Sequence, residues 1–415
     1  MKLPERKLRI AICGGRGIPH SYSGTEALVA QLAARLAARG HEMIVYCRSS
    51  LFRDRPAVYQ GVRLIYLPSI ETKVLGSPTH TLLCAFDVMF RKVDFVLVMN
   101  IVNGLHCAVF RALGQQCAIM VDGQDWKRGK WGRLARSYFH WCAKHIGKIC
   151  PRGVITDALG MRQIYLDEFG TTSACIASGA EIQVSTRPEV VRGYGLEPFQ
   201  YYLIASRLVP ENNADLIVKA FEHLRTDRVL AIAGTANYKS EFVEQLKKTK
   251  DPRVRFLGHV ADPEYMKELH CNAYAYVHGH SLGGVNPALL KALGCGNCVL
   301  ALNTPFNVEP LQNYGILFEH NVDDLARKLQ KIEDHPETAS EYRRRAPERI
   351  REAYSWETIT DQYEEFFLRL AAGEDPTRTH SSVTAVENGV LDPEKDVWVR
   401  QEASQDSGNA LLNKG

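Results

Sequence analysis

The stretch HGHSLGGVNPALLKALGCG, which begins at His278, has the residue types and spacing of an anion-binding turn. Gly283 and Gly284 permit a backbone path that is closed to other residues. Asn286 is a preferred helix N-cap and Pro287 fits the first helical position, so a helix is predicted to begin here. Free N–H groups and the helix dipole would face such a turn and could hold a phosphate group. An ordinary strand-to-helix connection would use the same residues.

A cationic side chain, Arg207, directly follows a predicted strand in the segment YYLIASRLVPENNADLIV. A guanidinium can hold a phosphate group through two parallel hydrogen bonds. Because parallel strands of one sheet end at the same edge, Arg207 and the turn at Gly283 are expected to converge on one diphosphate. A surface salt bridge is the alternative role for Arg207.

The first predicted strand ends in the glycine-rich loop CGGRGIPHSYSGTEAL. A dinucleotide-binding fingerprint would need a third glycine where His20 stands, and Pro19 prevents an immediate helix. The second predicted strand ends near Arg48 and lacks the acid that would hold a ribose, which argues against an NAD-dependent oxidoreductase. Arg16 is placed to meet an anion. Glu26 either caps the following helix or contacts a ligand.

A third loop, VDGQDWKRGKWGRLARSYFHWCAKHIGKICPRG, begins with Asp122 and Asp125 just after a predicted strand. Residues 126–152 include eight Lys or Arg residues, no acid, and interleaved aromatic residues. One interpretation is a basic, aromatic surface for anionic membrane lipid or for a lipid-pyrophosphate acceptor. The other is a solvated helix face with aromatic residues in the core. RNA binding fits less well because no RNA-binding module accompanies the basic run.

Composition indicates a globular protein of ordinary charge. The chain has 415 residues, enough for two domains, with 24% charged and 45% hydrophobic residues and a net charge of +4. No apolar run is long enough to span a membrane and no signal peptide is evident, so a cytoplasmic location is expected. The eleven scattered cysteines are expected to be buried free thiols. Cys295 and Cys298 are spaced like a metal or redox pair, but no second such pair exists and a turn is favoured.

Strand-like and helix-like segments alternate along most of the chain, which predicts α/β architecture with parallel sheets. Residues 1–183 are expected to form one Rossmann-like domain, residues 184–199 a linker, and residues 200–355 a second Rossmann-like domain. A closing helix is expected at 356–372 and a disordered tail at 373–415. Two such domains would face one another across a cleft at the carboxyl ends of their strands. The predicted strands span residues 8–13, 42–47, 62–68, 94–100, 117–122 and 153–158 in the first half and 201–206, 228–234, 254–258, 273–279, 298–303 and 315–319 in the second.

With these segments in order, the sequence resembles GT-B glycosyltransferases of the large retaining family four, in the branch that includes bacterial rhamnosyltransferases. The resemblance covers about residues 8–370 and is carried by the motifs Gly14-Gly-Arg-Gly-Ile-Pro19, Asp122-Gly-Gln-Asp-Trp-Lys-Arg128, Arg207-Leu-Val-Pro-Glu-Asn-Asn213, His280-Ser-Leu-Gly-Gly-Val-Asn-Pro287 and Thr304-Pro-Phe-Asn307. It implies a transferase that moves rhamnose or another hexose from a dTDP- or UDP-sugar. The implied acceptor is a lipid-linked glycan at the inner face of the membrane, in bacterial surface polysaccharide synthesis.

The residues and the resemblance together assign roles at the cleft. The predicted catalytic residues are Asp122, Asp125 and Arg207. The predicted donor-binding residues are Arg16, Gly17, Arg207, Asn212, Gly283, Gly284, Asn286 and Lys291. The residues assigned to the acceptor or membrane side are Glu26, Trp126, Lys127, Arg128 and Lys130. No acidic metal cluster is evident in the sequence, so transfer is predicted to need neither a metal ion nor another cofactor.

One position departs from the family pattern. Lys291 stands where family members usually have the glutamate that is taken to hold the ribose hydroxyls of the nucleotide, and Gly283 lacks the first acid of that pair. Lysine cannot accept hydrogen bonds from ribose, but it lies one turn beyond Pro287 and could reach a diphosphate. Three interpretations remain: an altered grip on the donor, a binding protein that has lost catalysis and partners another transferase, or an outward lysine without effect. A sugar-nucleotide epimerase on the same plan is a further alternative.

Overall fold

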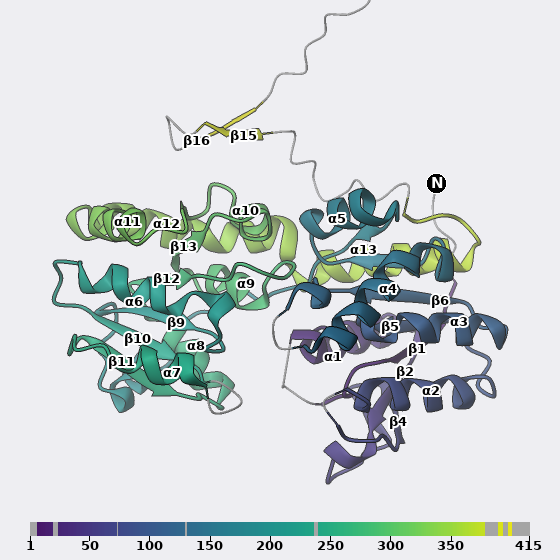
Figure 1. The fold of residues 1–415 in the computed structure, drawn as a ribbon. Helices are drawn as coiled ribbons and strands as arrows, with labels where there is room; N and C mark the ends of the chain where they lie inside the picture. Colours follow the sequence, from purple (N-terminus) through teal and green to yellow (C-terminus); the bar gives the residue numbers. More distant parts are fainter. Residues whose placement is uncertain are drawn as a thin grey trace, which may run out of the picture.

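The computed structural model describes residues 6–19, 24–72, 74–128, 131–235, 240–377, 389–392 and 397–400. Most of these residues belong to two large, mainly parallel sheets with helices packed against them (Figure 1). The α/β class and the two-domain arrangement expected from the alternating pattern are confirmed. None of the described helices is both long and apolar enough to cross a membrane.

The first sheet has eight strands in the order β3-β4-β2-β1-β5-β6-β7-β8, and all neighbours are parallel except β3 and β4. Its central strands are buried on both faces, which is why runs such as FVLVM in β5 contain no polar residue. The strands are β1 Arg9–Cys13, β2 Glu42–Arg48, β3 Val58–Tyr59, β4 Val62–Leu67, β5 Phe95–Met99, β6 Cys117–Val121, β7 Val154–Thr156 and β8 Ala174–Cys175. The connecting helices are α1 Gly24–Ala38, α2 Gly76–Val88, α3 Gly104–Ala112, α4 Arg133–Ile149 and α5 Leu159–Phe169, with short helical turns η1 Ser49–Leu51, η2 Ile101–Asn103 and η3 Asp125–Lys127.

The second sheet has six parallel strands in the order β11-β10-β9-β12-β13-β14. Its strands are β9 Tyr201–Ala205, β10 Val229–Ala233, β11 Val254–Gly258, β12 Ala275–His278, β13 Cys298–Leu302 and β14 Ile316–Phe318. The helices are α6 Ala214–Glu222, α7 Glu241–Leu246, α8 Pro263–Cys271, α9 Pro287–Gly294, α10 Pro305–Leu311, α11 Val322–Asp334 and α12 Pro336–Arg349, with a turn η5 Pro210–Asn212. The order places β9 and β12 at the centre, so the loops that follow them lie next to one another.

The segment between the two sheets is held to the second domain. It contains one helical turn, η4 Pro188–Tyr194, and its start is bound by Glu268. This carboxylate accepts hydrogen bonds from the Ser185 hydroxyl at 2.5 Å and from the N–H groups of Thr186 and Arg187 at 2.9 and 3.0 Å. Burial alone would raise the pKa of Glu268, but these hydrogen bonds lower it to about 2.

The last long helix returns to the first domain. After a π-helical turn, η6 Ile350–Tyr354, helix α13 Trp356–Ala371 begins at Ser355, whose hydroxyl accepts from Thr358 N–H at 3.1 Å. Its aromatic face enters the core of the first sheet, where the rings of Phe367 and Phe95 lie 4.8 Å apart. Within the expected tail, β15 Gly389–Asp392 and β16 Val397–Arg400 pair as an antiparallel ribbon.

Each of the predicted strands corresponds to an observed strand. The two-residue strands β3 and β8 were not expected, because so short a segment has no readable periodicity. Strands β15 and β16 were not expected either, because they lie in the segment 373–415 that was predicted to be a disordered tail. The carboxyl edges of β1 and β6 in the first sheet, and of β9 and β12 in the second, carry the segments that the sequence singled out.

Candidate active site

The loop between β12 and α9, residues 279–286, is referred to below as the glycine loop. Gly283 has a φ of +127°, a conformation that side chains disfavour, which is why glycine is needed here. Asn286 accepts a hydrogen bond from Ala288 N–H at 2.9 Å and Pro287 is the first helical residue, so the predicted helix start is confirmed. Within the described part of the chain, the N–H groups of Gly283 and Gly284 donate to no acceptor. They remain available to an anion.

Neighbouring loops fix the backbone of the glycine loop. Ser281 donates through both its hydroxyl and its N–H to a backbone carbonyl of η5, at 2.9 and 3.0 Å. The Asn307 amide donates to the carbonyl of His280 at 2.9 Å, and the Asn213 amide donates to the carbonyl of Gly279 at 2.7 Å. The Asn-Asn and Pro-Phe-Asn motifs therefore hold the loop in shape.

Arg207 follows β9 and its exposed guanidinium makes no hydrogen bond or ion pair with any described residue. Its charge acts on His280: burial, and then the Arg207 charge, lower the pKa of His280 to about 3. Asn212, predicted to bind the donor, is buried and donates to the backbone carbonyl of Arg207 at 2.8 Å. The structure therefore gives Asn212 a positioning contact, and leaves the exposed Arg207 near enough to the glycine loop for its charge to act on His280.

Two stacked imidazoles lead from the core to the glycine loop. The rings of His278 and His280 are 4.2 Å apart and nearly parallel, at 9°. The Tyr276 hydroxyl lies 3.2 Å from His278 Nδ1. His280 Nδ1 is buried and has no hydrogen-bond partner among the described residues, so it can serve a ligand at the loop.

The first domain contributes carboxylates to the opposite side. Asp122 directly follows β6, and it accepts from the Thr25 hydroxyl at 3.1 Å and from the Asn100 amide nitrogen at 3.0 and 3.2 Å. Burial, and then the charge of Asp125, raise the pKa of Asp122. Asp125 lies 3.4 Å from Arg128, which balances part of the negative charge. Asp122 and Asp125 thus lie together, as expected from their position after one strand.

A third carboxylate, Asp157, was not assigned from the sequence. It follows β7 and is buried, and its Oδ1 has no hydrogen-bond partner in the described residues. It touches the glycine loop directly, since a methyl group built on Gly284 would lie 1.9 Å from Asp157 Oδ1. Burial, and then the charges of Asp122 and Glu309, raise its pKa well above the ordinary value. Its place at the carboxyl edge of a strand, as for Asp122, was the signal that could have found it.

Glu309 connects the two domains near Asp157. Its Oε2 accepts the N–H of Leu159 at 2.7 Å, so a residue of α10 holds the start of α5 across the two domains. Burial raises the pKa of Glu309 to about 7. Another close approach occurs where a methyl group on Gly24 would lie 2.9 Å from the Pro287 ring. The two domains are in contact on both sides of the glycine loop.

Arg128 was predicted to lie on the acceptor or membrane side, but its guanidinium points to the glycine loop. A methyl group on Gly283 would lie 3.8 Å from its Nη2, and one on Gly123 would lie 2.9 Å from it. The ion pair with Asp125 fixes this direction. The loop therefore faces a cation from each domain, Arg128 and Arg207.

The remaining residues of the acceptor side are dispersed. Trp126 is buried against Tyr165 and Phe169, because its indole completes the aromatic cluster between η3 and α5. Lys127 pairs with Glu168 at 3.1 Å. Lys130 lies outside the described residues. These contacts do not form the exposed aromatic surface that the sequence suggested.

The loop after β1 is built around Glu26, which is buried and accepts the N–H of Arg16 at 3.2 Å. Gly17 has a φ of +107° and packs tightly on Cys47. A cavity of about 10 Å³ beneath this loop is large enough only for a water molecule. Glu26 thus holds the loop in place through Arg16, a contact different from the helix cap that the sequence suggested.

Lys291 lies toward α8, away from Arg207. The charges that raise its pKa come from Cys295, Cys271 and Glu264, although burial outweighs them and lowers the pKa overall. Its ammonium group makes no hydrogen bond or ion pair with a residue that the structure describes, although its backbone carbonyl accepts from Cys295 N–H at 2.9 Å. Its side chain is therefore turned to the space between α8 and α9.

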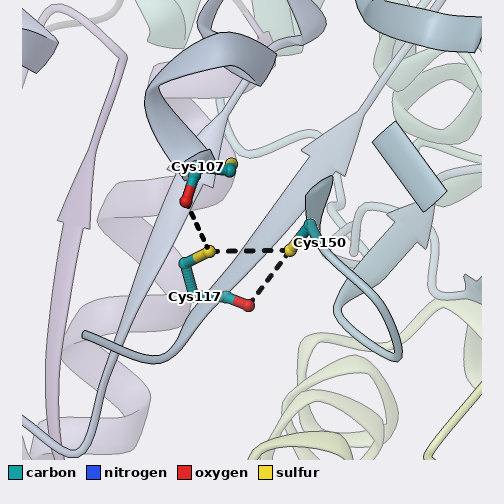
Figure 2. Close-up of side chains that lie close together, drawn as sticks. All are labelled: Cys107, Cys117 and Cys150. Atoms are coloured by element: carbon teal, nitrogen blue, oxygen red, sulfur yellow. Dashed lines mark hydrogen bonds between the residues drawn. The ribbon is translucent and has the colours of Figure 1, made fainter. Parts of the chain in front are cut away.

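All eleven cysteines are free and buried, as expected. Cys107, Cys117 and Cys150 are the one group of described residues with metal-ligand spacing, their sulfur atoms lying within 4.8 Å of one another (Figure 2). They lie between α3, β6 and the end of α4. The Cys150 thiol donates to the carbonyl of Cys117 at 3.1 Å, and the Cys117 thiol to that of Cys107 at 3.7 Å. The group is a hydrogen-bonded part of the core, separate from the glycine loop.

The fold and its two halves have relatives among known proteins. Residues 192–349 match the family described as Glycosyl transferases group 1, and residues 7–181 match Domain of unknown function (DUF1972). The chain is similar to the structure of HepE (Alr3699) of Anabaena in complex with UDP, with a TM-score of 0.69 and 14% identity, over 87% of this chain and 99% of that one. Sucrose-phosphate synthase of Thermosynechococcus elongatus has a TM-score of 0.70 and 18% identity, over 89% of this chain and 100% of that one. No curated protein matches.

The two facing sheets therefore define a protein of the GT-B fold. The residues that match the family described as Glycosyl transferases group 1 lie in the second domain, and they include the glycine loop and Arg207.

Proposed function

We propose that this protein is a glycosyltransferase that moves a hexose, such as rhamnose, from a dTDP- or UDP-sugar to a lipid-linked glycan. The observation that carries the proposal is the contact between Asp157, a buried carboxyl group with an unpartnered oxygen, and Gly284 of an amide-lined loop. Such a pair places a sugar-binding group beside a phosphate-binding one. HepE, whose fold is similar, was solved with UDP and with UDP-glucose, which supports a nucleotide-sugar donor.

The second domain would bind the leaving group. When the bond between the sugar C1 and the diphosphate oxygen breaks, negative charge grows on the diphosphate. The N–H groups of Gly283 and Gly284, with Arg207 and Arg128, are fixed donors aimed at that charge, and such donors usually contribute most to catalysis. No resident metal ion or other cofactor is part of the proposal, since these cations supply the neutralisation.

The first domain would bind the reacting hydroxyl groups. We assign Asp157 to a hydroxyl of the donor sugar, and Asp122 with Asp125 to the acceptor hydroxyl. The acceptor oxygen forms the new bond to C1 on the face that the diphosphate leaves, so the anomeric configuration is retained. Its proton passes to an oxygen of the departing diphosphate, which balances the reaction without an enzyme nucleophile.

The setting follows from the resemblance of the sequence to the rhamnosyltransferase branch of retaining family four. The lipid-linked acceptor would be a glycan precursor of capsule, exopolysaccharide or lipopolysaccharide. The protein would work in the cytoplasm, in peripheral contact with the inner face of the cell membrane.

A second candidate is a catalytically impaired protein that binds a nucleotide sugar or glycan for another transferase. Lys291 favours it, because a lysine occupies the ribose-binding position and its charge lies next to α8. Lys291→Glu separates the two functions. Transfer that appears only in this variant would support the impaired protein, whereas transfer by the wild type would exclude it.

The test is a panel of nucleotide sugars. A donor at about a hundredfold its dissociation constant should stabilise the fold by roughly 2.7 kcal/mol, measured as a thermal shift. UDP- or dTDP-sugars should give the shift and NAD(H) should give none. Donors that bind are then incubated with lipid-linked glycans, and the anomeric configuration of the product is read by NMR. The absence of binding by any donor would refute the transferase and leave only a glycan-binding role for the second candidate, and a free altered sugar nucleotide would indicate an epimerase.

A further inference from the structure

Helices α2, α3 and α4 lie on one face of the first sheet. The connections from β4 to β5, β5 to β6 and β6 to β7 all run in the same direction across the sheet, and right-handed crossovers put their helices on one side. Helix α3 contacts both α2 and α4. Figure 1 shows these blue helices along one side of the domain. Helix α1 connects strands in the opposite direction and packs with α13 on the other face.

The outward side of α2 is apolar where a water-exposed helix would be polar, and α3 and α4 add further exposed apolar side chains between their polar ones. In α2 and just beyond it, Phe86 is 50% exposed and Phe90 is 80% exposed, although Cys84 and Val88 already supply the buried side. The exposed apolar residues of the three helices and their ends are Leu75, Leu82, Leu83, Phe86, Met89, Phe90, Leu105, Leu134 and Trp141. These side chains come from three neighbouring helices on one face of the sheet, and exposed apolar residues gathered on one face mark an interaction site. It is called the apolar face below.

The charged side chains of α3 and α4 all have one sign. Helices α3 and α4 contain no acidic residue, and the exposed side chains on them include the cations Arg111, Arg133, Lys144 and Lys148. The single acid of α2, Asp87, is paired with Arg91 and accepts a hydrogen bond from the Tyr46 hydroxyl at 2.7 Å. The face therefore joins apolar side chains to positive charge.

This combination fits the surface of an anionic bilayer, where apolar side chains enter the headgroup region and cations meet acidic lipids. A second copy of the chain fits less well. A twofold interface would set the same basic helices against each other, and like charges in contact disfavour association.

We propose that the apolar face seats the first domain on an anionic lipid bilayer. This inference rests on the proposed function and deepens it. Helix α4 begins at the carboxyl edge of the sheet, five residues after Arg128, and Leu134 in its first turn is 89% exposed. A lipid-linked acceptor lying in the same bilayer would reach Asp122 and Asp125 from this side. The membrane contact replaces the one that Trp126, which is buried, was expected to make.

The test is sedimentation of the full chain with phosphatidylcholine vesicles, with and without phosphatidylglycerol. The protein should bind the anionic vesicles, and salt should weaken the binding. Phe86→Ser/Phe90→Ser should lower the affinity at least about tenfold, because two large apolar groups no longer enter the lipid. Lys144→Gln/Lys148→Gln should lower it about fivefold for each charge removed.

The matched control is Val58→Ser/Val184→Ser, which changes two exposed apolar side chains outside the apolar face and should leave vesicle binding unchanged. All variants should keep the wild-type circular dichroism and the donor-induced thermal shift, so a failed donor test and a failed membrane test are distinguishable. Equal binding by the wild type and Phe86→Ser/Phe90→Ser would overturn the proposal, as would no binding at all. A dimer in light scattering that this variant dissociates would assign the face to a second copy instead.

Discussion

The two domains differ in whether the polar side chains around the glycine loop have hydrogen-bond partners. In the second domain, the polar side chains around the glycine loop are hydrogen-bonded to backbone atoms. The side chains of Asn213, Asn307 and Ser281 all donate to backbone carbonyls. In the first domain, Asp157 is buried with an oxygen that has no partner in the described residues, and its pKa is raised. A fixed loop with open N–H groups is prepared for an anion before it arrives. An unpaired carboxyl group is costly until a ligand hydroxyl reaches it.

This difference predicts separate roles for the two domains. The second domain should determine how tightly the diphosphate is held, and the first domain should determine whether the bound sugar reacts. The contact between Asp157 and Gly284 joins the two, so substitutions there should have the largest effects.

The largest effect is expected from Gly284→Ala. The new methyl group would lie 1.9 Å from Asp157 Oδ1, so the two domains must separate or the carboxyl group must turn away. A displacement of about 1 Å in a site of this kind costs on the order of a hundredfold in rate. Initial rates of transfer at saturating donor should show this loss.

Gly193→Ala is the matched control, because a methyl group there meets no atom within 4 Å and the rate should stay at the wild-type level. The double variant Gly284→Ala/Asp157→Ala should recover the closed shape, measured as a radius of gyration by solution scattering, but not the rate. A Gly284→Ala enzyme of full activity would show that Asp157 and the glycine loop do not act together.

Asp157→Asn should separate stability from activity. Because the folded-state pKa of Asp157 is raised, the carboxyl group in the unfolded chain ionises first, and folding stability falls as pH rises above the ordinary aspartate pKa. The amide does not ionise, so the variant should be more stable than the wild type at pH 8, with a smaller difference at pH 4. Chemical denaturation at both pH values measures this.

Transfer by Asp157→Asn should fall by one to two orders of magnitude, as for a lost hydrogen bond to a charged group of about 1.5–3 kcal/mol. The fall should appear in kcat more than in KM, since the donor diphosphate is held by the other domain. A variant that is both less stable and fully active would assign Asp157 to packing alone.

Arg207→Ala should weaken donor binding by about 1.5–3 kcal/mol, because a charge-assisted contact to the diphosphate is lost. The effect should appear in the donor dissociation constant by calorimetry and should be smaller for UMP, which has one phosphate. Arg225→Ala, which removes another exposed arginine of the same domain, is the control. Unchanged donor affinity in Arg207→Ala would place the diphosphate elsewhere.

The strands of both large sheets could be predicted from the sequence because they are apolar runs between clear turns. The helix start at Asn286 could be predicted because a helix cap depends on a few neighbouring residues. It was insufficient for Asp157, which was taken as the end of the run GVITDA. Its importance comes from contact with Gly284, a residue of the other domain, and no local pattern encodes that contact.

The exposure of the side chains in the basic segment after Asp125 could not be predicted from the sequence for a related reason. Aromatic residues between cations are compatible with a surface or with a core, and the choice depends on what packs against them. The partners Tyr165 and Phe169 of α5 bury Trp126, whereas Trp141 contacts the His145 ring of its own helix and is 44% exposed. The approach of Arg128 to the glycine loop likewise depends on how the second domain packs against the first.

The smallest effect is expected at Lys291. Since its charge lies toward Glu264 and Cys271, its removal should change donor affinity by less than about 0.5 kcal/mol, well below the effect of Arg207→Ala. Calorimetry on Lys291→Ala, with Lys219→Ala as an exposed-lysine control, measures the difference. If Lys291→Ala weakens donor binding as strongly as Arg207→Ala, the lysine must swing from α8 to the diphosphate when the donor binds. The second domain would then bind the diphosphate partly through a contact that forms only when the donor binds. Its anion site would be less fully preformed than the hydrogen bonds of the glycine loop indicate.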